Sequence, residues 1–190
     1  MAVTRSGAMT LFVSGYLQFM SLSIAVQPDP PRVVPELPHH AEAVLALVDR
    51  AFGPGRLAKS SERLREGNRK LEDCCFVALR GEAVVGSVRL WPVTVGGVPL
   101  AFLGPLAVEA GRRSEGLGQA LVEAACAAAA AAGWRAVLLV GDAPYFARIG
   151  FSAGPAAQAI MPGPADQRRV LVKALVPGGD EGLVGPIAIA

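Results

Sequence analysis

The feature that most constrains the fold is a strand–helix–strand unit in the second half of the chain. The run PLAFLGPLAV at 99–108 is apolar enough to be a buried strand, and an alanine-rich run from about 117 to 132 favours a helix. The run RAVLLVG at 135–141 has the continuous hydrophobicity of a buried parallel strand. A strand, a helix and a strand in this order form a right-handed crossover, so the two strands are expected to be parallel neighbours.

The strands before this unit are expected to be antiparallel. The segments CCFVALR at 74–80 and AVVGSVRLWPV at 83–93 are separated by Gly81 and Glu82, which is the pattern of a hairpin. A second turn, VGGV at 95–98, leads directly into the first strand of the crossover unit. The sequence therefore predicts a mixed, mostly antiparallel sheet.

Further helical and strand patterns flank this region. AEAVLALVDRAF at 41–52 places apolar residues at helical spacing, and Gly53 ends the pattern. The charged stretch AKSSERLREGNRK at 58–70 is amphipathic and is expected to lie over the surface. A short helical segment, APYFARIGF at 143–151, and a strand, RRVLVKALV at 168–176, follow the crossover unit.

Length and composition indicate one folded domain. The chain has 190 residues, of which 52% are hydrophobic and 18% are charged, as in a globular protein with one core. Its net charge of +2 is too small for nucleic acid to be an expected partner. The three cysteines include an adjacent pair, Cys74 and Cys75, and no spacing of cysteine and histidine suggests a metal site. We therefore expect a cytoplasmic protein with reduced thiols and no metal.

The N-terminal segment is expected to lie outside this domain. Residues 6–28 carry no charge and follow Arg5, which is the pattern of a signal peptide cleaved after Ala25. The run is too polar for a typical membrane anchor, so no membrane partner is expected unless it is a genuine targeting segment. We favour a third interpretation, a true start at Met20, and keep export as the alternative.

The loop before the long helix suits a bound anion. RSEGLG at 113–118 reads R-x-x-G-x-G at the start of a helix, where backbone amides lack intrahelical partners and the dipole is positive. Gly116 and Gly118 remove side chains that would hold a phosphate away. Arg112 and Arg113 add positive charge at the same end. This pattern predicts a phosphate-binding cradle.

Two familiar phosphate loops do not fit this segment. In a dinucleotide-binding fingerprint the glycines follow the strand directly, and the third glycine would stand where this chain has Leu121. A nucleotide-binding P-loop needs Gly-Lys followed by Ser or Thr, which the sequence lacks. Taken alone, the motif also fits an ordinary glycine-rich loop.

Taken together, these segments resemble the GNAT superfamily of acyl-CoA-dependent N-acetyltransferases, and above all its small bacterial members of uncharacterised substrate. The resemblance is carried by GPLAVEAGRRSEGLG at 104–118, VLLVGDAP at 137–144 and YFARIGF at 145–151. It extends as an order of elements over roughly residues 32–176.

The resemblance implies an α+β fold of three layers. Its sheet is mixed and mostly antiparallel, with a central parallel strand pair that forms a V-shaped cleft and helices on both faces. It also implies an N-terminal extension at 1–31, an N-acetyltransferase domain at 32–177 and a C-terminal tail at 178–190.

Acetyl-CoA is the cosubstrate that the resemblance implies, with no metal. In the family the strand before the cradle is bulged and its free backbone groups bind the pantetheine arm, a role that Leu106, Ala107 and Val108 would have here. A backbone amide near Leu106 or Ala107 would polarise the thioester carbonyl. The residues expected to bind the pyrophosphate are Arg113, Ser114, Glu115, Gly116, Leu117 and Gly118.

The departing thiolate is either protonated by an acid of the protein or leaves without one. The family commonly places a tyrosine five residues before the phenylalanine of its Gly-Phe pair, and counting back from Phe151 that position holds Phe146. The neighbouring Tyr145 is therefore the candidate acid. A thiol pKa of about 8.5 also allows the thiolate to leave without an acid.

Several groups are candidates for the general base that accepts the proton of the amine. Asp142 and Glu109 follow the two parallel strands and would lie near the cleft, although Asp142 before Ala-Pro is also a good helix cap, and water is a further candidate. Ser87, Arg89 and Trp91 share one face of the middle strand and would line the acceptor pocket. Alternatively, these three side chains belong to a packed or solvated face of the sheet and have no role in binding the acceptor.

The resemblance thus implies transfer of an acetyl group from acetyl-CoA to a primary amine by direct attack. The acceptor, a small molecule or a protein, cannot be named from the sequence, and a homodimer is left open. The alternative function is a non-catalytic acyl-CoA-binding sensor or regulatory module, which Phe146 at the usual tyrosine position favours.

Overall fold

The computed structural model describes residues 30–190, apart from the side chains of Arg113 and Ser114. The expectations for residues 1–29, including the signal-peptide interpretation, lie outside the described residues. The strands are β1 (Arg32–Pro35), β2 (Phe76–Arg80), β3 (Ala83–Val95), β4 (Val98–Val108), β5 (Ala136–Val140), β6 (Gln158–Ile160), β7 (Val170–Ala174) and β8 (Val184–Ile189). The α-helices are α1 (Ala41–Phe52), α2 (Leu117–Ala131) and α3 (Ala143–Ala147).

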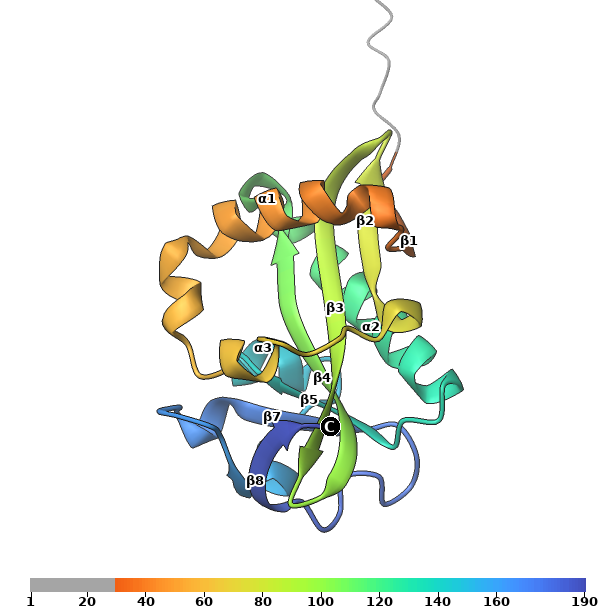
Figure 1. Ribbon diagram of the computed structural model, residues 1–190. Coiled ribbons are helices and arrows are strands. Elements are labelled where there is room, and N and C mark those ends of the chain that lie inside the picture. The colour runs from red at the N-terminus through yellow and green to blue at the C-terminus, as the bar shows by residue number, and fades with distance from the viewer. Residues whose placement is uncertain (1–29) are drawn as a thin grey trace, which may run out of the picture.

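The sheet has the mixed topology that the sequence predicts. Its main path runs β1-β2-β3-β4-β5-β7, and β8 pairs with β3 beyond the segment of β3 that pairs with β2 (Figure 1). Along this path only β4 and β5 are parallel, and the other neighbours are antiparallel. A central parallel pair within a mostly antiparallel sheet is therefore confirmed.

Helix α2 connects the two parallel strands and lies close to the sheet. It ends just before Gly133, which has a φ of 86°. Its buried face is rich in alanine, and a Cβ atom on Gly86 of β3 would lie 2.9 Å from Leu121 of the helix. The small residues on both elements thus let the helix approach the strand, as the predicted crossover requires.

Strand β4 contains a bulge near its middle. Leu90 of β3 lies opposite Leu103, but Val88 lies opposite Leu106, so β4 has one residue more than β3 between these pairs. The extra residue falls at Gly104, whose φ of 146° is unusual for residues with a side chain. The bulge expected from the resemblance is thus present.

The two parallel strands diverge after a short contact. Pairing between β4 and β5 covers only residues 101–103 and 137–139, whereas β4 continues to Val108. The carboxyl-terminal part of β4 therefore has no strand neighbour on the β5 side. This divergence is the V-shaped cleft that the resemblance implies.

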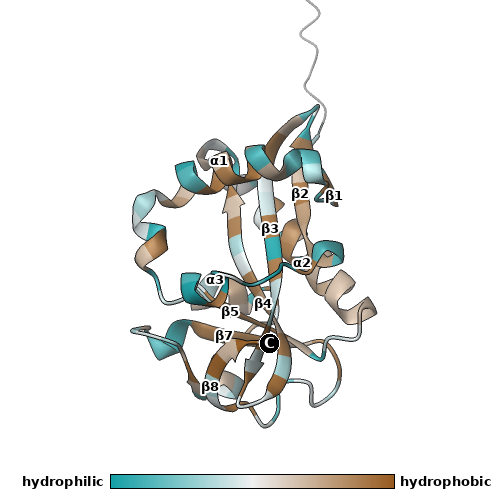
Figure 2. Ribbon diagram, in the orientation of Figure 1, coloured by the Kyte–Doolittle hydropathy of each residue, from teal (hydrophilic) through white to brown (hydrophobic). Residues whose placement is uncertain are grey.

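Helices cover both faces of the sheet. Helix α1 packs on the face that presents Val77, Leu79 and Ala107, and α2 packs on the face that presents Ala78 and Val88 (Figure 1). Helix α1 carries both hydrophilic and hydrophobic residues, as an amphipathic surface helix does (Figure 2). Within residues 30–190, no helix combines the length and apolar character needed to cross a membrane.

The structure adds one strand to the elements that the sequence predicts. Residues 178–190 were expected to be a C-terminal tail, and within them residues 184–189 form β8 and pair with β3 and β6. The pairing partners are distant in the sequence, so no local pattern reveals them. The amphipathic stretch at 58–70, which was expected to lie over the surface, contains a short 3-10 turn, η3 (Glu62–Leu64), and most of its residues are at least partly exposed.

Candidate active site

A cavity of about 650 Å³ lies between the diverging ends of β4 and β5, a volume typical of small-molecule pockets. Its apolar lining includes Phe52, Phe102, Leu103, Leu106, Leu139, Phe146 and Met161. Its charged lining comprises Arg56, Lys59, Arg65, Asp166 and Arg169. The cavity therefore combines an apolar interior with charged groups.

The backbone of β4 presents unpaired polar groups toward the diverging strands. The amide of Glu109 donates to the carbonyl of Val85 at 3.0 Å, so in the alternating antiparallel ladder Ala107 also exchanges hydrogen bonds with β3. The amides and carbonyls of Leu106 and Val108 then face away from β3, on the side that β5 has left. These groups are available to an extended ligand that runs along β4.

The predicted cradle forms the start of α2. A 3-10 turn, η5 (Ala110–Glu115), leads to Gly116, which has a φ of 75° and precedes the helix. A Cβ atom at position 116 would meet no heavy atom within 4 Å, so the space in front of the helix is open. Arg112, which the sequence predicts to add charge here, pairs with Glu109 at 3.9 Å and Glu115 at 3.3 Å. The main-chain amides of the first helical turn lack intrahelical partners, and amides of this kind can bind an anion.

The side chain of Tyr145 links this cradle with the cavity. Tyr145 lies in α3, lines the cavity and is 37% exposed. A Cβ atom added at Gly118 would lie 2.5 Å from the Tyr145 hydroxyl oxygen, so the hydroxyl lies against the first turn of α2. Partial burial raises the pKa of Tyr145 above its ordinary value, which keeps the hydroxyl protonated at neutral pH.

Phe146 has a different environment from its neighbour. Its ring is buried and contacts the rings of Tyr145 and Phe151 edge-on, with centroids 4.9 and 5.7 Å away. A Cβ atom on Gly141 would lie 2.3 Å from the Phe146 ring, so the ring occupies space that only glycine leaves free. Phe146 therefore belongs to the core beneath the cavity and offers no proton.

Sequence similarity identifies the family to which this fold belongs. The sequence matches the acetyltransferase (GNAT) family over residues 41–151. The chain belongs to the GNAT acetyltransferase family. The resemblance predicted from the cradle, the parallel strands and the α3 segment is thereby confirmed.

Individual GNAT proteins are similar over most of the domain. The chain is 34% identical over 119 residues to YhbS of Escherichia coli strain K12, an uncharacterized N-acetyltransferase, and the alignment covers 61% of this chain and 70% of YhbS. The crystal structure of Escherichia coli YhbS in complex with CoA superposes with a TM-score of 0.72 at 28% identity, over 85% of this chain and 92% of YhbS. A Brucella melitensis GNAT acetyltransferase in complex with acetyl-CoA has the same fold, with a TM-score of 0.62 at 23% identity over 85% of this chain and 96% of that one.

The two carboxylates considered as bases do not line the cavity of this GNAT protein. Asp142 accepts a hydrogen bond from the Tyr145 amide at 3.2 Å, so the interpretation as a helix cap is confirmed. Glu109 pairs with Arg50 at 3.4 Å, and neither carboxylate lines the cavity. Among the described residues, Asp166 is the carboxylate that does line it, and its side chain pairs with Arg168.

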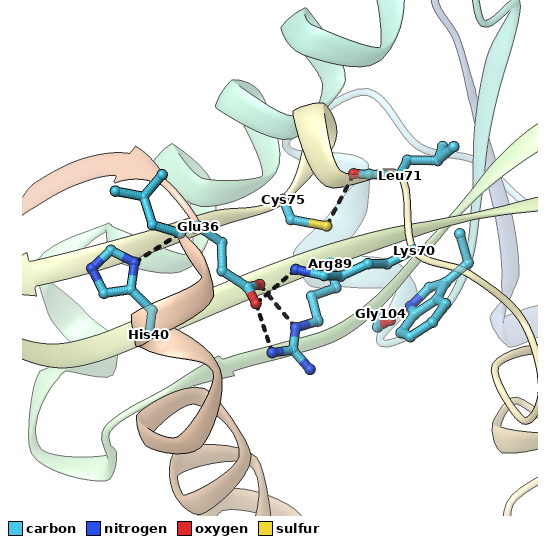
Figure 3. Close-up of polar contacts among 9 residues, drawn as sticks. Glu36, His40, Lys70, Leu71, Cys75, Arg89 and Gly104 are labelled. Carbon is cyan, nitrogen blue, oxygen red and sulfur yellow. Dashed lines mark hydrogen bonds and ion pairs between the residues drawn. The ribbon is translucent and has the colours of Figure 1, made fainter.

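The middle-strand residues pack within the fold and do not line the cavity. Arg89 donates two hydrogen bonds to Glu36, at 2.7 and 2.8 Å, and Lys70 donates a third at 3.0 Å (Figure 3). Trp91 donates to the carbonyl of Gly104 at 2.5 Å. Burial alone would raise the pKa of Glu36, but the hydrogen bonds from Arg89 and Lys70 outweigh it and lower that pKa.

The Ser87 side chain, on the same face, is buried, and its hydroxyl oxygen has no hydrogen-bond partner among the described residues. None of the three candidate residues on this strand lines the cavity. The alternative interpretation, a packed sheet face, thus describes Ser87, Arg89 and Trp91 better.

The sequence patterns did not predict the cations that line the cavity. Arg56, Lys59 and Arg65 come from the 3-10 segment after α1, and Arg169 comes from the turn before β7. The pair of adjacent arginines at 168 and 169 was the one visible signal, and no local pattern connects it with the other three residues. Only the folded chain brings these cations to one cavity.

The cysteines of this GNAT protein are core residues. All three are buried and unpaired, and burial raises the pKa of the Cys75 and Cys126 thiols to about 11. Neither is therefore a thiolate nucleophile at neutral pH. Within residues 30–190, no cluster of histidine, cysteine and acidic residues could hold a metal ion.

Proposed function

We propose that the protein transfers an acetyl group from acetyl-CoA to a primary amine by direct attack of the amine on the thioester. The observation that carries this proposal is the pair of outward-facing backbone segments at Leu106 and Val108, next to the open amino end of α2. An extended pantetheine arm could pair with the strand while its pyrophosphate binds the helix start. Membership of the GNAT family and the CoA-bound relatives support the same ligand.

In this arrangement the cradle residues at 113–118 would hold the pyrophosphate. Leu106 and Val108 would hold the pantetheine arm, while Ala107, between them, packs its side chain beneath α1. The Leu106 amide, which faces the cavity side, would donate to the thioester carbonyl as negative charge develops on its oxygen. The acetyl carbon would then lie within the cavity, next to the acceptor.

The ammonium form of the acceptor first loses one proton. The neutral amine nitrogen then forms a bond to the acetyl carbon and gives up a second proton, the carbon–sulfur bond breaks, and the thiolate takes up one proton from an acid that the second nitrogen proton restores. We propose that Tyr145 is this acid, because its hydroxyl lies between the cavity and the cradle and stays protonated at neutral pH. Water in the cavity would accept the proton that the ammonium form of the acceptor must lose.

Cofactor binding can be tested with Gly116→Glu and a matched Gly116→Ala variant. Both substitutions carry the strain of a φ of 75°, which costs about 1–2 kcal/mol, but only the carboxylate would repel a phosphate. Calorimetry with acetyl-CoA should show at least tenfold weaker binding for Gly116→Glu than for Gly116→Ala. Equal affinities would show that the cradle does not hold the pyrophosphate.

A second candidate function is a non-catalytic acyl-CoA sensor. The burial of Phe146 at the usual tyrosine position favours it, since no hydroxyl is present there. This candidate predicts acetyl-CoA binding without release of CoA thiol across a broad panel of amines. Release of CoA with any amine, together with loss of that release in Tyr145→Phe, would favour the transferase instead.

A further inference from the structure

The charged lining of the cavity indicates which amines the protein accepts. We infer that the acceptor is a small amine that also carries an anionic group, a carboxylate or a phosphate, and that cations of the cavity bind this group. The inference rests on the proposed acetyl transfer, because it names the acceptor class for that reaction. The four cations that line the cavity, Arg56, Lys59, Arg65 and Arg169, are called the cationic wall below.

The most buried part of the cationic wall consists of Arg56 and Arg65, which line the cavity although their carboxylate partners do not. Arg56 and Arg65 share a single carboxylate, Glu62, with nitrogen–oxygen distances of 3.4 and 2.5 Å. Their side chains are only 19% and 11% exposed. Arg56 also pairs with Asp49 at 3.0 Å, and that carboxylate is 63% exposed. Neither Glu62 nor Asp49 lines the cavity, so the two partly buried guanidinium groups contribute to the lining without their carboxylate partners, which favours an additional anion there.

Arg65 is directed toward the β4 bulge. A Cβ atom on Gly104 would lie 3.1 Å from Nη1 of Arg65, while Nη2 of the same side chain holds Glu62. The bulge marks the point where β4 and β5 separate, and the thioester is proposed to lie there. Arg65 is therefore placed to bind an anionic group of a molecule whose amine attacks that thioester.

The two outer cations form no ion pair among the described residues, although Arg169 lies near enough to Asp166 to help the hydrogen bonds from Arg168 lower the pKa of that carboxyl. Lys59 lies over the ring of Phe52, with 5.5 Å between its ammonium nitrogen and the ring centroid. Arg169 uses its Nε to donate to the Gly141 carbonyl at 3.1 Å. The nearby Asp166 is held by Arg168 at 2.9 Å. Both outer cations can thus add to the attraction for an anion.

The phosphates of CoA would bind elsewhere. The cradle at 113–118 contributes no residue to the cavity lining, and Tyr145 lies between the two regions. A CoA whose pyrophosphate binds the cradle would bring only its acyl end into the cavity, and the cationic wall would remain for the acceptor. The volume of about 650 Å³ suits a small molecule rather than a protein segment.

The same charges would prepare the amine for attack. Nearby cations disfavour an ammonium group and so lower its pKa, which increases the fraction of neutral amine at a given pH. This effect would oppose binding of a simple cationic amine. An anionic group in the same molecule offsets the repulsion, because it places a negative charge against the arginines.

Matched pairs of amines test the inference in the full-length protein with acetyl-CoA. The pairs are 4-aminobutyrate with butylamine, O-phosphoethanolamine with ethanolamine, and α-amino acids with their primary amides. Release of CoA thiol gives kcat/KM for each member. In at least one pair we expect kcat/KM of the member that carries the anionic group (the anionic member) to exceed that of the member without it (the neutral member) by about tenfold or more, since hydrogen bonds to charged groups have this magnitude.

Charge-removing variants identify the residues responsible. Arg65→Gln should lower the ratio of kcat/KM between the anionic and neutral members by about tenfold, and Lys59→Gln by less, because Lys59 is exposed. Arg148→Gln removes the same charge from an exposed residue outside the cavity lining and should leave the ratio unchanged. If Arg65→Gln fails to fold, the exposed Lys59→Gln and Arg169→Gln variants decide the question.

The outcomes separate this inference from the proposed function. Equal or faster turnover of the neutral member in every pair would overturn the inference while leaving acetyl transfer intact. If no amine is acetylated although acetyl-CoA binds, the proposed function fails. Calorimetry of the CoA-loaded protein with 4-aminobutyrate and butylamine then decides the inference: preferential binding of 4-aminobutyrate supports an anionic ligand, and equal binding overturns it.

Discussion

The hydroxyl of Tyr145 lies against Gly118, where an added Cβ atom would be only 2.5 Å from the hydroxyl oxygen. This contact joins the first turn of α2, which is proposed to hold the pyrophosphate, to the side chain that is proposed to protonate the thiolate. The next tyrosine atom, Cζ, would be 3.7 Å from the same Cβ, which is an ordinary packing distance. Glycine at position 118 is thus required by the hydroxyl group and not by the ring.

Gly118→Ala should therefore displace the Tyr145 hydroxyl. Because Tyr145 is 37% exposed, its side chain can move away, and we expect the free energy of unfolding to change by less than about 1 kcal/mol. Loss of the positioned acid should lower kcat at saturating acetyl-CoA by about tenfold or more. Denaturant unfolding and CoA release measure the two effects.

A double-mutant cycle with Tyr145→Phe serves as the control for this prediction. If both substitutions act through the hydroxyl, the double variant should have nearly the same kcat as Tyr145→Phe alone. Additive losses would instead show that the methyl group at position 118 acts on CoA directly.

The raised pKa of Tyr145 predicts the pH dependence of the reaction. Burial raises this pKa above its ordinary value, so the hydroxyl remains a proton donor until the pH exceeds that raised value. With an amine acceptor, kcat should increase with pH as the amine loses its proton, and should decrease only at strongly alkaline pH, where Tyr145 ionises. Tyr145→Phe should lower kcat by about 100-fold and abolish the alkaline decrease. An unchanged kcat would mean that the thiolate leaves without an acid.

Local sequence patterns predicted the elements around the cleft, but not all of the site. Helix α1 has the bounds of the predicted amphipathic segment at 41–52, since apolar spacing and a following glycine act locally. Strand β8 was missed because Gly185 and Pro186 weaken its strand pattern and its pairing with β3 is long-range. The role of Arg65 beside Gly104 was missed for the same reason, as no periodicity relates these residues.

The buried cluster around Glu36 should make a large contribution to stability. The Glu36 side chain is fully buried, and that of Arg89 is 12% exposed. Glu36→Gln leaves two partly buried cations, Arg89 and Lys70, without a counter-charge, so the free energy of unfolding should fall by about 3 kcal/mol at pH 7. Asp49→Asn, which breaks an ion pair whose carboxylate is 63% exposed, is the control and should cost less than about 1 kcal/mol.

The same carboxylate predicts how stability changes in acid. Because the hydrogen bonds of Glu36 outweigh its burial and hold its pKa below the ordinary value of 4.5, its contribution is complete above that value. The contribution should be lost as the pH falls from about 4.5 through the lowered pKa, because the unfolded chain then binds a proton more readily. Urea unfolding should show the wild type and Glu36→Gln converging over this acidic range, and a constant difference would contradict the assignment.

Packing between Gly141 and Phe146 gives a final prediction about the floor of the cleft. A Cβ atom on Gly141 would lie 2.3 and 2.6 Å from two ring atoms of Phe146 and 2.9 Å from Leu139, and the buried ring has little room to move. Gly141→Ala should therefore lower the free energy of unfolding by about 1–3 kcal/mol. Gly154→Ala is the matched control, because its Cβ would meet no heavy atom within 4 Å, and it should change stability by less than about 0.5 kcal/mol. Equal stabilities of the two variants would mean that the floor of the cleft can repack around the added methyl group.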